Sequence, residues 1–250
     1  MQGVLRIAIV GAQGQLGQAI SRAAESQQDV KIIARYGRET PINSSIEQCD
    51  VVIDVSATDA SEQVCAACAE HHKPLVIGTT GHSPDQLREI EAAARVIPIV
   101  LAPNFSVGVN TLFWLARKAA ELLGNDFDIE VVEAHHRCKK DAPSGTAKRL
   151  AQLLCDVRGL RYEQDVVHGR DGIVGERPAN QIGMHAVRAG EIVGEHTVMF
   201  AGPGEVVELT HRASSRDTFA VGALRAARWV VGQPPRLYGM EQVLGLDLAT

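Results

Sequence analysis

The chain has 250 residues, of which 45% are hydrophobic, 22% charged and 4% aromatic, and its formal net charge is −5. This composition is typical of a soluble globular protein and excludes a disordered or low-complexity chain. The basic residues are scattered rather than clustered, so we expect no nucleic-acid partner. The five cysteines are an odd number, which indicates free thiols in a reducing cytoplasm rather than a disulfide framework.

One stretch of the sequence has the length and apolarity of a membrane span. Residues 96–116 carry no charge, but they include Pro98, Pro103 and Gly108, which would break a membrane helix and leave polar backbone groups unpaired in hydrocarbon. We therefore expect a buried strand, a loop and a helix here, and no membrane partner. The apolar first ten residues are too short for a signal peptide, so a cytoplasmic location is expected.

Short apolar runs rich in β-branched residues alternate with helical patterns through the first hundred residues. Apolar strands that alternate with helices predict a parallel sheet covered on both faces, which is an α/β fold. The predicted strands are Leu5 to Val10, Val30 to Ile33, Val51 to Val55, Leu75 to Ile77 and Ile97 to Leu101, and the predicted helices are Gln15 to Glu25, Ala60 to His71 and Pro84 to Arg95.

The pattern changes after Asn104, where a second, α+β region is predicted. Two helices flank a strand, and an antiparallel hairpin then closes on a four-residue turn, Ala201 to Gly204. Residues 161–181 are rich in glycine and charge and predict a surface loop. The predicted helices are Val107 to Leu123, Ser144 to Cys155 and Asp217 to Val231, and the predicted strands are Asp128 to His136, Glu195 to Phe200 and Val206 to Ala213.

A glycine-rich turn follows the first predicted strand. Gly11, Gly14 and Gly17 are spaced as G-x-x-G-x-x-G and open a predicted helix. Glycines let the backbone turn tightly and approach a pyrophosphate, and the helix N-terminus adds partial positive charge. We therefore interpret residues 11–17 as a dinucleotide-binding turn, for which a tight structural turn is the alternative.

The end of the second predicted strand lacks the acidic residue that usually binds the ribose hydroxyls of NAD. The sequence there reads Ala34-Arg35-Tyr36-Gly37-Arg38, and an arginine at this place suits a 2′-phosphate. We therefore expect NADPH to be preferred to NADH. Solvated loop arginines are the alternative, and Glu39 lies one position too late to replace the missing acid.

Two loops at the carboxyl ends of later strands carry small polar residues. They read Gly78-Thr79-Thr80-Gly81 and Ala102-Pro103-Asn104-Phe105-Ser106. Ligands of open α/β sheets bind at these strand ends, so the hydroxyl groups suit a nicotinamide ribose and Asn104 suits a carboxamide. Ordinary turn chemistry explains the residue types but not their recurrence at strand ends.

The segment from Glu133 to Ala147 concentrates groups that transfer protons or bind anions. On the predicted strand, Glu133 and His135 point to one face and His136 to the other. Two lysines precede Pro143-Ser144-Gly145-Thr146, which predicts a helix start with free N–H groups. This combination suits a carboxylate substrate that must also receive a proton, and a solvated charged loop is the alternative.

Cys65 and Cys68, followed by His71 and His72, have the residue types of a zinc or redox site. They lie on a predicted amphipathic helix, where cysteine acts as a small buried hydrophobic residue, and no second pair of ligands is near in the sequence. We therefore expect inert thiols and no metal.

These motifs together resemble the 4-hydroxy-tetrahydrodipicolinate reductase family, also called dihydrodipicolinate reductase, over nearly the whole chain. The segment around His135 and Lys139 is the most specific part of the likeness, and the glycine turn is the least specific. The resemblance rests on residues 11–17, 76–81, 104–110, 133–147, 187–190, 193–197, 214–216 and 218–220.

The resemblance implies an NAD(P)H-dependent oxidoreductase of the diaminopimelate route to lysine. The implied reaction reduces the cyclic imine dicarboxylate 4-hydroxy-tetrahydrodipicolinate to tetrahydrodipicolinate, with loss of water. The implied architecture is a Rossmann-like nucleotide domain, residues 1–106 and 216–250, and an inserted substrate-binding and tetramerisation domain, residues 107–215, built on a mixed, largely antiparallel sheet. The implied assembly is a homotetramer.

The resemblance also implies roles for the residues that match the family's motifs. His135 is the expected acid/base residue and Lys139 the expected proton donor. The expected substrate-binding residues are His136, Gly145 and Thr146, and the expected cofactor-binding residues are Gly11, Ala12, Gln13, Gly14, Gln15, Leu16, Arg38, Gly78, Thr79, Thr80, Ala102, Pro103, Asn104 and Phe105.

Two other functions fit the same motifs. One is a reductase of the same architecture that acts on another small imine or keto acid, and the other is a non-catalytic nucleotide-sensing module. The presence of both His135 and Lys139 favours an enzyme. The chain departs from the family at Gly37, where an acid often stands, which disfavours strong NADH use, and in a short connection from Arg38 to Asp50.

Overall fold

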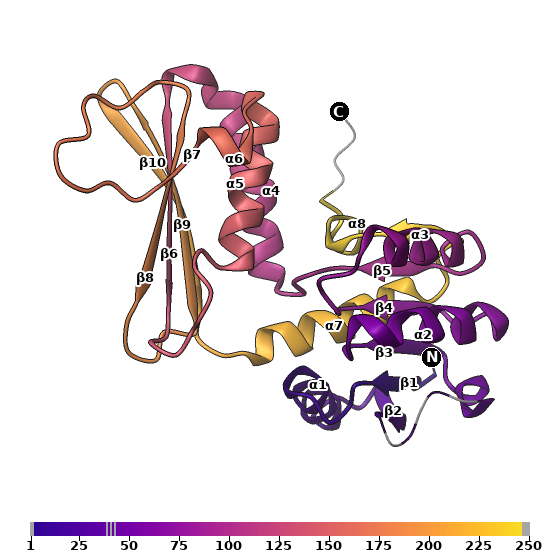
Figure 1. Ribbon diagram of the computed structural model, residues 1–250. Helices are drawn as coiled ribbons and strands as arrows, with labels where there is room; N and C mark the ends of the chain where they lie inside the picture. Colours follow the sequence, from indigo (N-terminus) through magenta and orange to yellow (C-terminus); the bar gives the residue numbers. More distant parts are fainter. Residues whose placement is uncertain (1–2, 39, 41, 43, 247–250) are drawn as a thin grey trace. The chain divides into compact units, whose positions relative to one another are not determined.

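The computed structural model describes residues 3–38, 40, 42 and 44–246, and the chain forms two compact units (Figure 1). Unit 1 comprises Met1–Val107 and Arg216–Thr250, and unit 2 comprises Gly108–Ser215. Unit 2 is therefore an insertion into unit 1, and each unit has its own sheet.

Unit 1 is built on a six-stranded sheet in the order β11-β5-β4-β3-β1-β2. All neighbouring strands run parallel, because the chain returns through a crossover between them. The strands are β1 (Leu5–Val10), β2 (Val30–Tyr36), β3 (Val51–Asp54), β4 (Leu75–Ile77), β5 (Ile99–Leu101) and β11 (Leu237–Tyr238).

Helices cover both faces of this sheet, as the apolar strands predicted. Ile7 and Ile9 of β1 belong to an apolar cluster with α1, α7 and α8, whereas Ala8 and Val10 belong to a second cluster with α2 and α3. The predicted α/β fold is confirmed. The helices are α1 (Gln15–Glu25), α2 (Thr58–Glu70), α3 (Pro84–Ala93), α7 (Asp217–Val230) and α8 (Met240–Leu244), and a 3₁₀ turn, η1 (Ser44–Gln48), lies in the short connection before β3.

The strand order changes direction at β1, which has β2 on one side and β3 on the other. Open α/β sheets bind ligands outside the carboxyl ends of the strands at such a switch point. The loops that follow β1 and β3 therefore define the place where a ligand of unit 1 is expected.

Unit 2 is built on a five-stranded mixed sheet in the order β10-β9-β6-β8-β7. The pairings of β9 with β10 and with β6 are antiparallel, and those of β8 with β6 and with β7 are parallel. The sheet is mixed, as expected, with two antiparallel and two parallel strand pairings. The strands are β6 (Asp128–His135), β7 (Val166–His168), β8 (Ile182–Arg188), β9 (Gly194–Gly202) and β10 (Glu205–Ala213).

The helices of unit 2 pack on one face of this sheet. Alternate residues of β6, namely Ile129, Val131, Glu133 and His135, are buried on that face, and the apolar ones join α4 and α5 in one core cluster. The polar pair is thus carried into a buried position by the period-two alternation of the strand. The helices are α4 (Val107–Leu123), α5 (Gly145–Arg158) and the short α6 (Tyr162–Asp165), and a 3₁₀ turn, η2 (Gly124–Asp126), follows α4.

The hairpin of β9 and β10 has a tighter turn than predicted. Ala201 pairs with Val206 and Gly202 with Glu205, so Pro203 and Gly204 alone form the turn. A Cβ at Gly202 would lie 2.6 Å from the ring of Phe127. Gly202, which was predicted to lie in the turn, is therefore a strand residue whose missing side chain leaves space for the Phe127 ring.

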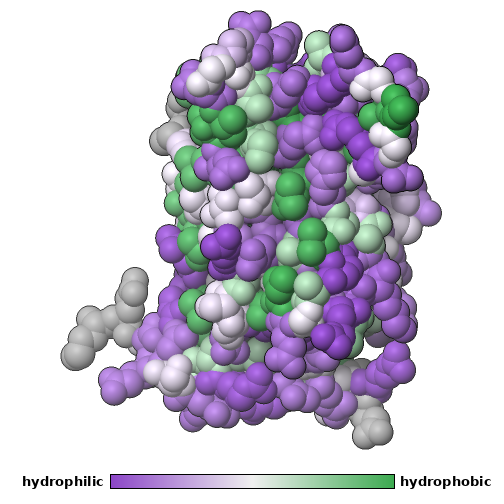
Figure 2. All heavy atoms as spheres, turned by 90° about the vertical axis from the view of Figure 1, so that its left-hand side faces the viewer, coloured by the Kyte–Doolittle hydropathy of each residue, from purple (hydrophilic) through white to green (hydrophobic). Residues whose placement is uncertain are grey.

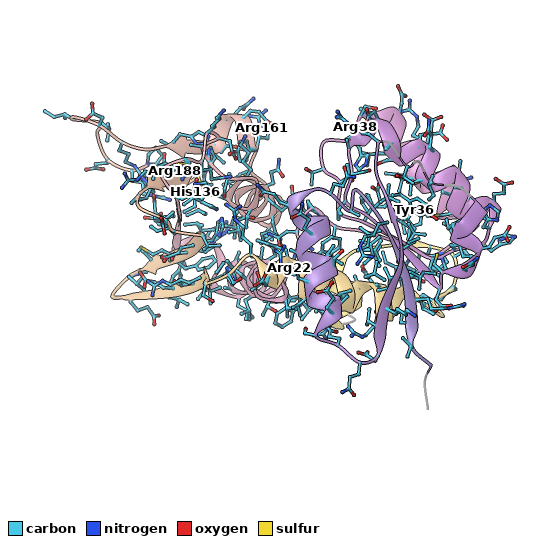
Figure 3. All side chains as sticks on the ribbon, turned by 90° about the horizontal axis from the view of Figure 1, so that it is seen from below. Arg22, Tyr36, Arg38, His136, Arg161 and Arg188 are labelled. Atoms are coloured by element: carbon cyan, nitrogen blue, oxygen red, sulfur yellow. The ribbon has the colours of Figure 1, made fainter. Side chains whose placement is uncertain are left out.

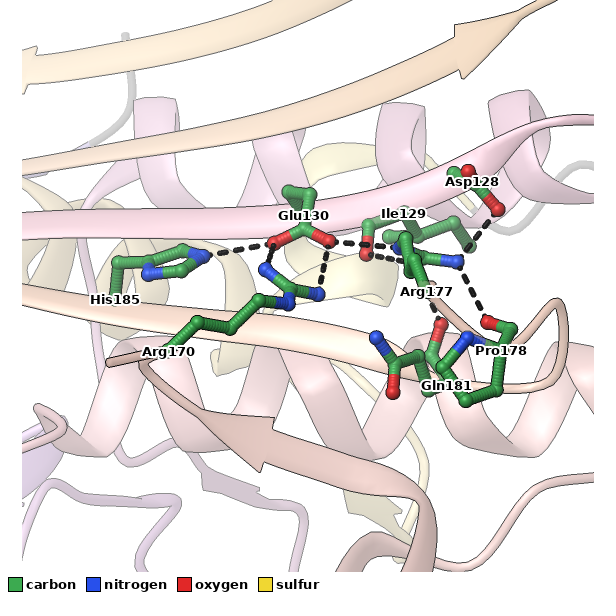
Figure 4. Close-up of polar contacts among 8 residues, drawn as sticks. All are labelled: Asp128, Ile129, Glu130, Arg170, Arg177, Pro178, Gln181 and His185. Atoms are coloured by element: carbon green, nitrogen blue, oxygen red, sulfur yellow. Dashed lines mark hydrogen bonds and ion pairs between the residues drawn. The ribbon is translucent and has the colours of Figure 1, made fainter. Parts of the chain in front are cut away.

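The predicted surface loop 161–181 is partly ordered into α6 and β7 and is anchored to the sheet. Arg170 donates to both carboxylate oxygens of Glu130 on β6, at 3.1 and 2.8 Å, and Arg177 donates to the same carboxylate at 3.0 Å and to Asp128 at 2.5 Å (Figure 4). His185 of β8 lies 2.7 Å from Glu130. The charged residues of the predicted surface loop therefore form a network of hydrogen bonds and ion pairs that connects the loop to β6 and β8.

Other element boundaries differ by a few residues. The strand β2 continues to Tyr36, three residues beyond its predicted end, because its ladder with β1 continues to the pair Val10 and Tyr36. The strand β5 begins at Ile99, because Ile97 still donates to Ala93 in the turn after α3. Within the described residues, no helix is both long and apolar enough to cross a membrane.

Candidate active site

The glycine turn after β1 is held against the loop after β3. Gly11 has φ +81°, in the left-handed region that favours glycine, and a Cβ there would lie 2.5 Å from the carbonyl oxygen of Val55. A Cβ at Gly17 would lie 2.3 Å from the carbonyl oxygen of Gly11. Side chains are therefore excluded at both positions, and the wall of the turn is backbone.

The N-terminus of α1 opens toward this turn. Gly14 is the N-cap residue, has extended backbone and supplies no side-chain cap, and the first turn of α1 contains no acidic residue. The partial positive charge of the helix end is therefore not neutralised by its own first turn. This arrangement binds the pyrophosphate in dinucleotide folds.

A cavity of about 560 Å³ extends from the glycine turn to the end of β2. Gly11, Gly14 and Arg38 line it, together with residues of the β3–α2 loop and of α2. Arg38 lies two residues after Tyr36, the last residue of β2, and is exposed; both residues are labelled in Figure 3. Arg35 lies inside β2 and is not among the lining residues, so of these two arginines the one that lines the cavity is Arg38, the expected cofactor-binding residue.

A second cavity, of about 330 Å³, lies along the same loop after β3. Leu16 and residues 78–80 line it, and it shares Val55, Ser56 and Ala57 with the first cavity. The buried hydroxyl oxygen of Thr79 has no hydrogen-bond partner within the described residues. A buried hydroxyl without a partner is uncommon, and a ligand hydroxyl would satisfy it. The residues present therefore fit an extended dinucleotide.

The predicted cofactor loop 102–105 is less accessible than its residue types indicated. Ala102 and Phe105 are buried, and a Cβ at Gly78 would lie 2.5 Å from the Phe105 ring, so this ring packs beneath the glycine. The side-chain oxygen of Asn104 accepts a hydrogen bond of 2.8 Å from the backbone N–H of Ser106. Ala102 and Phe105 can therefore contact a cofactor through backbone atoms alone. The hydrogen bond of the Asn104 side chain stabilises the turn that leads into α4.

Asp54, at the end of β3, supports the wall of both cavities and was not selected from the sequence. It is fully buried and accepts hydrogen bonds from the backbone and hydroxyl of Ser56, at 3.0 and 2.5 Å, and from the hydroxyl of Ser61 at 3.2 Å. The Ser61 hydroxyl lies 2.9 Å from Nε2 of His82. Burial raises the pKa of Asp54, although these hydrogen bonds oppose the rise. The network ties the loop after β3 to α2.

In unit 2, His135 is paired with a buried carboxylate. Its Nδ1 lies 2.6 Å from Oε2 of Glu133, which is fully buried on the same face of β6. Arg188 of β8, the cross-strand neighbour of His135, donates to both oxygens of Glu133, at 2.8 and 2.7 Å. Figure 3 shows Arg188 close to His136, where β6 and β8 end.

The charges of this pair follow from burial and hydrogen bonding. Burial opposes ionisation of Glu133, but hydrogen bonds from Arg188, His135 and the Ser144 backbone outweigh it and lower the pKa of the carboxyl. Burial lowers the pKa of His135 despite the neighbouring carboxylate, so the imidazole is mainly neutral at pH 7.

Lys139 lies on the loop that follows β6. Its Nζ forms an ion pair of 2.9 Å with Asp141, and its charge is among those that lower the pKa of His135. Arg188 donates to the carbonyl oxygen of Asp141 at 2.7 Å. The same arginine thus holds both the buried carboxylate and the loop that carries the lysine.

The helix α5 begins where this loop ends. Ser144 is its N-cap, and the serine hydroxyl accepts a hydrogen bond of 3.2 Å from the Ala147 backbone and lies 2.9 Å from Nε2 of His196. Burial lowers the pKa of His196 to about 3, so this imidazole stays neutral. A Cβ at Gly145 would meet no atom within 4 Å, so the space beside the helix start is open.

The structure brings His135, Lys139 and the start of α5 into one region of unit 2. Four residues that complete this region belong to the motifs quoted from the sequence but were not named there as catalytic or binding residues: Glu133, Ser144, Arg188 and His196. The spacing of Glu133 and His135 on one strand face was a usable signal. Arg188 belongs to a motif of the family resemblance, residues 187–190, but its contact with Glu133 could not be predicted, because the two residues are 55 positions apart and meet only through strand pairing.

The two cysteines of α2 lie in the apolar core, as expected for an amphipathic helix. Cys65 and Cys68 are buried, and burial raises the pKa of the Cys65 thiol to about 12 and that of Cys68 well above its ordinary value. Thiols that stay protonated are poor nucleophiles and poor metal ligands. No group of three or more metal-ligating side chains occurs within the part of the chain that the structure describes.

Comparison with known proteins gives the family. Residues 5–105 match the sequence model described as dihydrodipicolinate reductase, N-terminus, and residues 108–244 match the one described as dihydrodipicolinate reductase, C-terminus. The chain belongs to the dihydrodipicolinate reductase family. As a family member it is an enzyme of the NAD(P)-dependent oxidoreductases, and the predicted family is confirmed.

Individual dihydrodipicolinate reductases resemble the chain over nearly its whole length. The curated 4-hydroxy-tetrahydrodipicolinate reductase of Akkermansia muciniphila is 51% identical over 244 residues, 98% of this chain and 99% of the relative. That of Geobacter sulfurreducens is 44% identical over 263 residues, 96% of this chain and 99% of the relative. A dipicolinate-bound dihydrodipicolinate reductase from Paenisporosarcina sp. TG-14 has a TM-score of 0.80 at 25% identity, over 96% of this chain and 100% of the other.

Proposed function

We propose that this chain reduces 4-hydroxy-tetrahydrodipicolinate to tetrahydrodipicolinate in the diaminopimelate route to lysine. One substrate molecule, one NAD(P)H and one proton give the product, NAD(P)⁺ and water. The observation that carries the proposal is the buried pair of Glu133 and His135 beside the open start of α5, because it places a proton-transfer group next to an anion site. The curated relatives that carry this activity in their names support the substrate.

Unit 1 is the proposed dinucleotide-binding domain. Residues 11–16 would hold the pyrophosphate at the start of α1, and Gly78, Thr79 and Thr80 would contact the nicotinamide ribose. The backbone of residues 102–105 completes the proposed contacts. The bound nicotinamide supplies the hydride, and the chain's own contribution is to bind and orient it.

Unit 2 is the proposed substrate domain. His135 is the proposed acid/base residue, and Lys139 would leave Asp141 to deliver the proton that balances the hydride. Gly145 and Thr146 contribute the N-terminal N–H groups of α5, which would bind a substrate carboxylate together with His136. The dipicolinate in the Paenisporosarcina enzyme is a ring with two carboxylates, which is the chemistry this helix start suits.

NADPH is the proposed preferred cofactor, with NADH as the alternative. Arg38 lines the larger cavity and Gly37 places no acid next to it in the chain, so a 2′-phosphate would gain a charge-assisted contact; the one acid among the described residues that line this cavity, Asp59, belongs to α2. The nearby Glu39 lies outside the described residues.

A homotetramer is the proposed assembly, formed through the outward face of the unit 2 sheet. Helices cover the other face, whereas this face, seen in Figure 2, exposes apolar side chains among polar ones. Val187 and Val206 lie on it and are 44% and 56% exposed. A strand face with exposed apolar residues is a common protein interface. The free state of all five cysteines supports the proposed cytoplasmic location.

The proposed function is tested with enzymatically prepared 4-hydroxy-tetrahydrodipicolinate and NADPH. The wild-type chain should oxidise NADPH only when this substrate is supplied. H135A and K139A should each lower kcat by about 10²-fold or more, with little change in the KM for NADPH, since both residues lie outside the unit that contains the glycine turn. K148A, at an exposed position of α5, is the matched control and should retain activity.

Two results would contradict this assignment. Comparable turnover of simple 2-keto acids would favour a reductase of different specificity. Tight NADPH binding without turnover of any imine or keto acid would favour a nucleotide sensor.

A further inference from the structure

We propose that Glu133 and Arg188 act as a positioning pair. The pair presents Nε2 of His135 to the substrate and holds the start of α5 in a fixed position relative to His135. The proposal rests on the proposed function for the role of His135. It assigns a task to two residues that do not themselves contact the reacting atoms.

The hydrogen bonds of Glu133 carry the first part of the argument. Its fully buried carboxylate accepts from Nδ1 of His135, from both terminal nitrogens of Arg188 and from the backbone N–H of Ser144, at 2.6 to 3.0 Å. An ionised carboxylate only accepts, so Nδ1 of His135 must carry the proton. The neutral imidazole is thereby held as the Nδ1–H tautomer, and its Nε2 is left with a free lone pair.

The surroundings of Nε2 agree with this orientation. A Cβ at Gly194 would lie 3.1 Å from Nε2 of His135, so the glycine keeps side-chain atoms away from this nitrogen. The neighbouring His196 ring meets His135 edge to face at 5.2 Å between centroids. His196 is buried and neutral, so it restricts the ring of His135 without adding charge.

Arg188 links the carboxylate to the other parts of the region. It forms a two-pronged contact with Glu133 and also donates to the carbonyl oxygen of Asp141, whose side chain pairs with Lys139. Glu133 in turn accepts from the Ser144 backbone at the helix start. One ion pair therefore joins β6, β8, the lysine loop and the N-terminus of α5.

A purely stabilising role explains this arrangement less well. A buried ion pair is often no more stable than apolar residues of the same volume, because both charges must be desolvated. In this site both oxygens of the Glu133 carboxylate bind groups with a proposed role in the reaction: one accepts a hydrogen bond from the His135 imidazole and the other from the backbone at the start of α5. A carboxylate that binds both groups fixes the imidazole and the helix start relative to each other, which is what a positioning role requires.

The charged and titratable groups that face His135 make the proposal testable. They are Glu133 on its own strand, Arg188 on β8, His196 on β9 and Lys139 on the following loop. The carboxylate of Glu133 raises the pKa of His135, whereas burial and the charges of Lys139 and Arg188 lower it. Removing Glu133 and removing Arg188 must therefore move the His135 pKa in opposite directions.

The experiment measures the imidazole of His135 by NMR in the full chain, with E133Q and R188M as variants. In the wild type, neutral His135 should carry its proton on Nδ1. The pKa of His135 should fall in E133Q and rise in R188M, and kcat should fall by about 10²-fold in E133Q while the KM for NADPH stays within about twofold. The matched control is E130Q, the same substitution on the opposite face of β6, which should leave the His135 pKa unchanged.

Three outcomes overturn the proposal: an Nε2–H tautomer in the wild type, shifts of the same sign in both variants, or an unchanged kcat in E133Q. The tautomer of His135 is measured in the wild-type chain, so this part of the test does not depend on whether a variant folds. A wild type that lacks reductase activity would refute the proposed function and with it the role of His135, while the NMR results would still report the pairing separately.

Discussion

At the scale of single residues, the position of a charge relative to the cavity matters more than its presence. Arg35 and Arg38 are both exposed arginines near the end of β2, yet Arg38 alone lines the cavity that extends from the glycine turn. A 2′-phosphate is distinguished from a hydroxyl by its negative charge, so a nearby arginine favours NADPH without affecting the rest of the dinucleotide.

R38A should therefore weaken NADPH selectively. We expect its dissociation constant to increase by roughly 5- to 30-fold, equivalent to about 1–2 kcal/mol for a solvent-exposed charge-assisted contact, with little change for NADH. Titration calorimetry with both cofactors measures this. R35A is the matched control, because the residue is outside the lining of the cavity. Equal losses for both cofactors would show that Arg38 does not contact the 2′-phosphate.

At the scale of elements, buried or half-buried charges hold segments that the hydrophobic pattern leaves undefined. Glu130 accepts from Arg170, Arg177 and His185, and so joins the segment after β7 to β6 and β8 (Figure 4). A Cβ at Gly183 would lie 1.7 Å from the Glu130 carboxylate, so the glycine of β8 provides the space for it. Burial opposes ionisation of Glu130, but these hydrogen bonds lower its pKa to about 2.

This network predicts a pH-dependent stability. A carboxyl whose pKa is lower in the folded than in the unfolded chain stabilises the fold above the unfolded pKa, and this contribution is lost as pH falls toward the folded pKa. Lowering the pKa from 4.5 to about 2 corresponds to about 3 kcal/mol of stability at neutral pH. E130Q should remove it.

Urea unfolding of the wild type and E130Q measures the effect. The difference in the free energy of unfolding should be largest at pH 6–7 and decrease steadily between about pH 4.5 and pH 2, the range between the two pKa values. E91Q, which removes an exposed carboxylate of α3 in unit 1, is the control and should show no such trend. A pH-independent difference would mean that Glu130 acts by packing and not by charge.

At the scale of the whole molecule, the chain is a parallel-sheet unit interrupted by a second unit with its own core. The helix α7, with which the chain re-enters unit 1 after the insertion, packs beside α1, so residues separated by about 200 positions share one apolar cluster. Unit 2 covers one face of its sheet with α4 and α5, and among the described residues of this unit no helix lies on the other face, where the segment after β7 contacts Glu130. This face without helices is where we expect the subunits of the proposed tetramer to meet.

Placing charges on that face should dissociate the assembly. The double variant V187E/V206E should elute as a smaller species than the wild type, because each carboxylate would have to be desolvated in the interface. Light scattering coupled to gel filtration gives the masses. L122K, which changes an exposed apolar residue of α4 instead, should keep the wild-type mass. A monomeric wild type at micromolar concentration would refute the proposed assembly.

The sequence by itself determined the parts of this protein that depend on local chemistry. Apolar runs and helical periods predicted the parallel sheet, and α1 and α4 begin and end at their predicted residues. The Gly11 turn was recognisable because its backbone requires glycine, and the Glu133 to Ala147 segment because it concentrates proton-transfer and anion-binding groups.

The tertiary structure alone decided which distant residues meet. The contact of Arg188 with Glu133, the loop held by Asp54 and the different positions of Arg35 and Arg38 depend on strand register and burial. Strand register and burial cannot be predicted from neighbouring residues in the sequence, because a shift of one position in register reverses the face to which every side chain of a strand points. The candidate residues were therefore predictable one by one, whereas the hydrogen bonds that orient them were not.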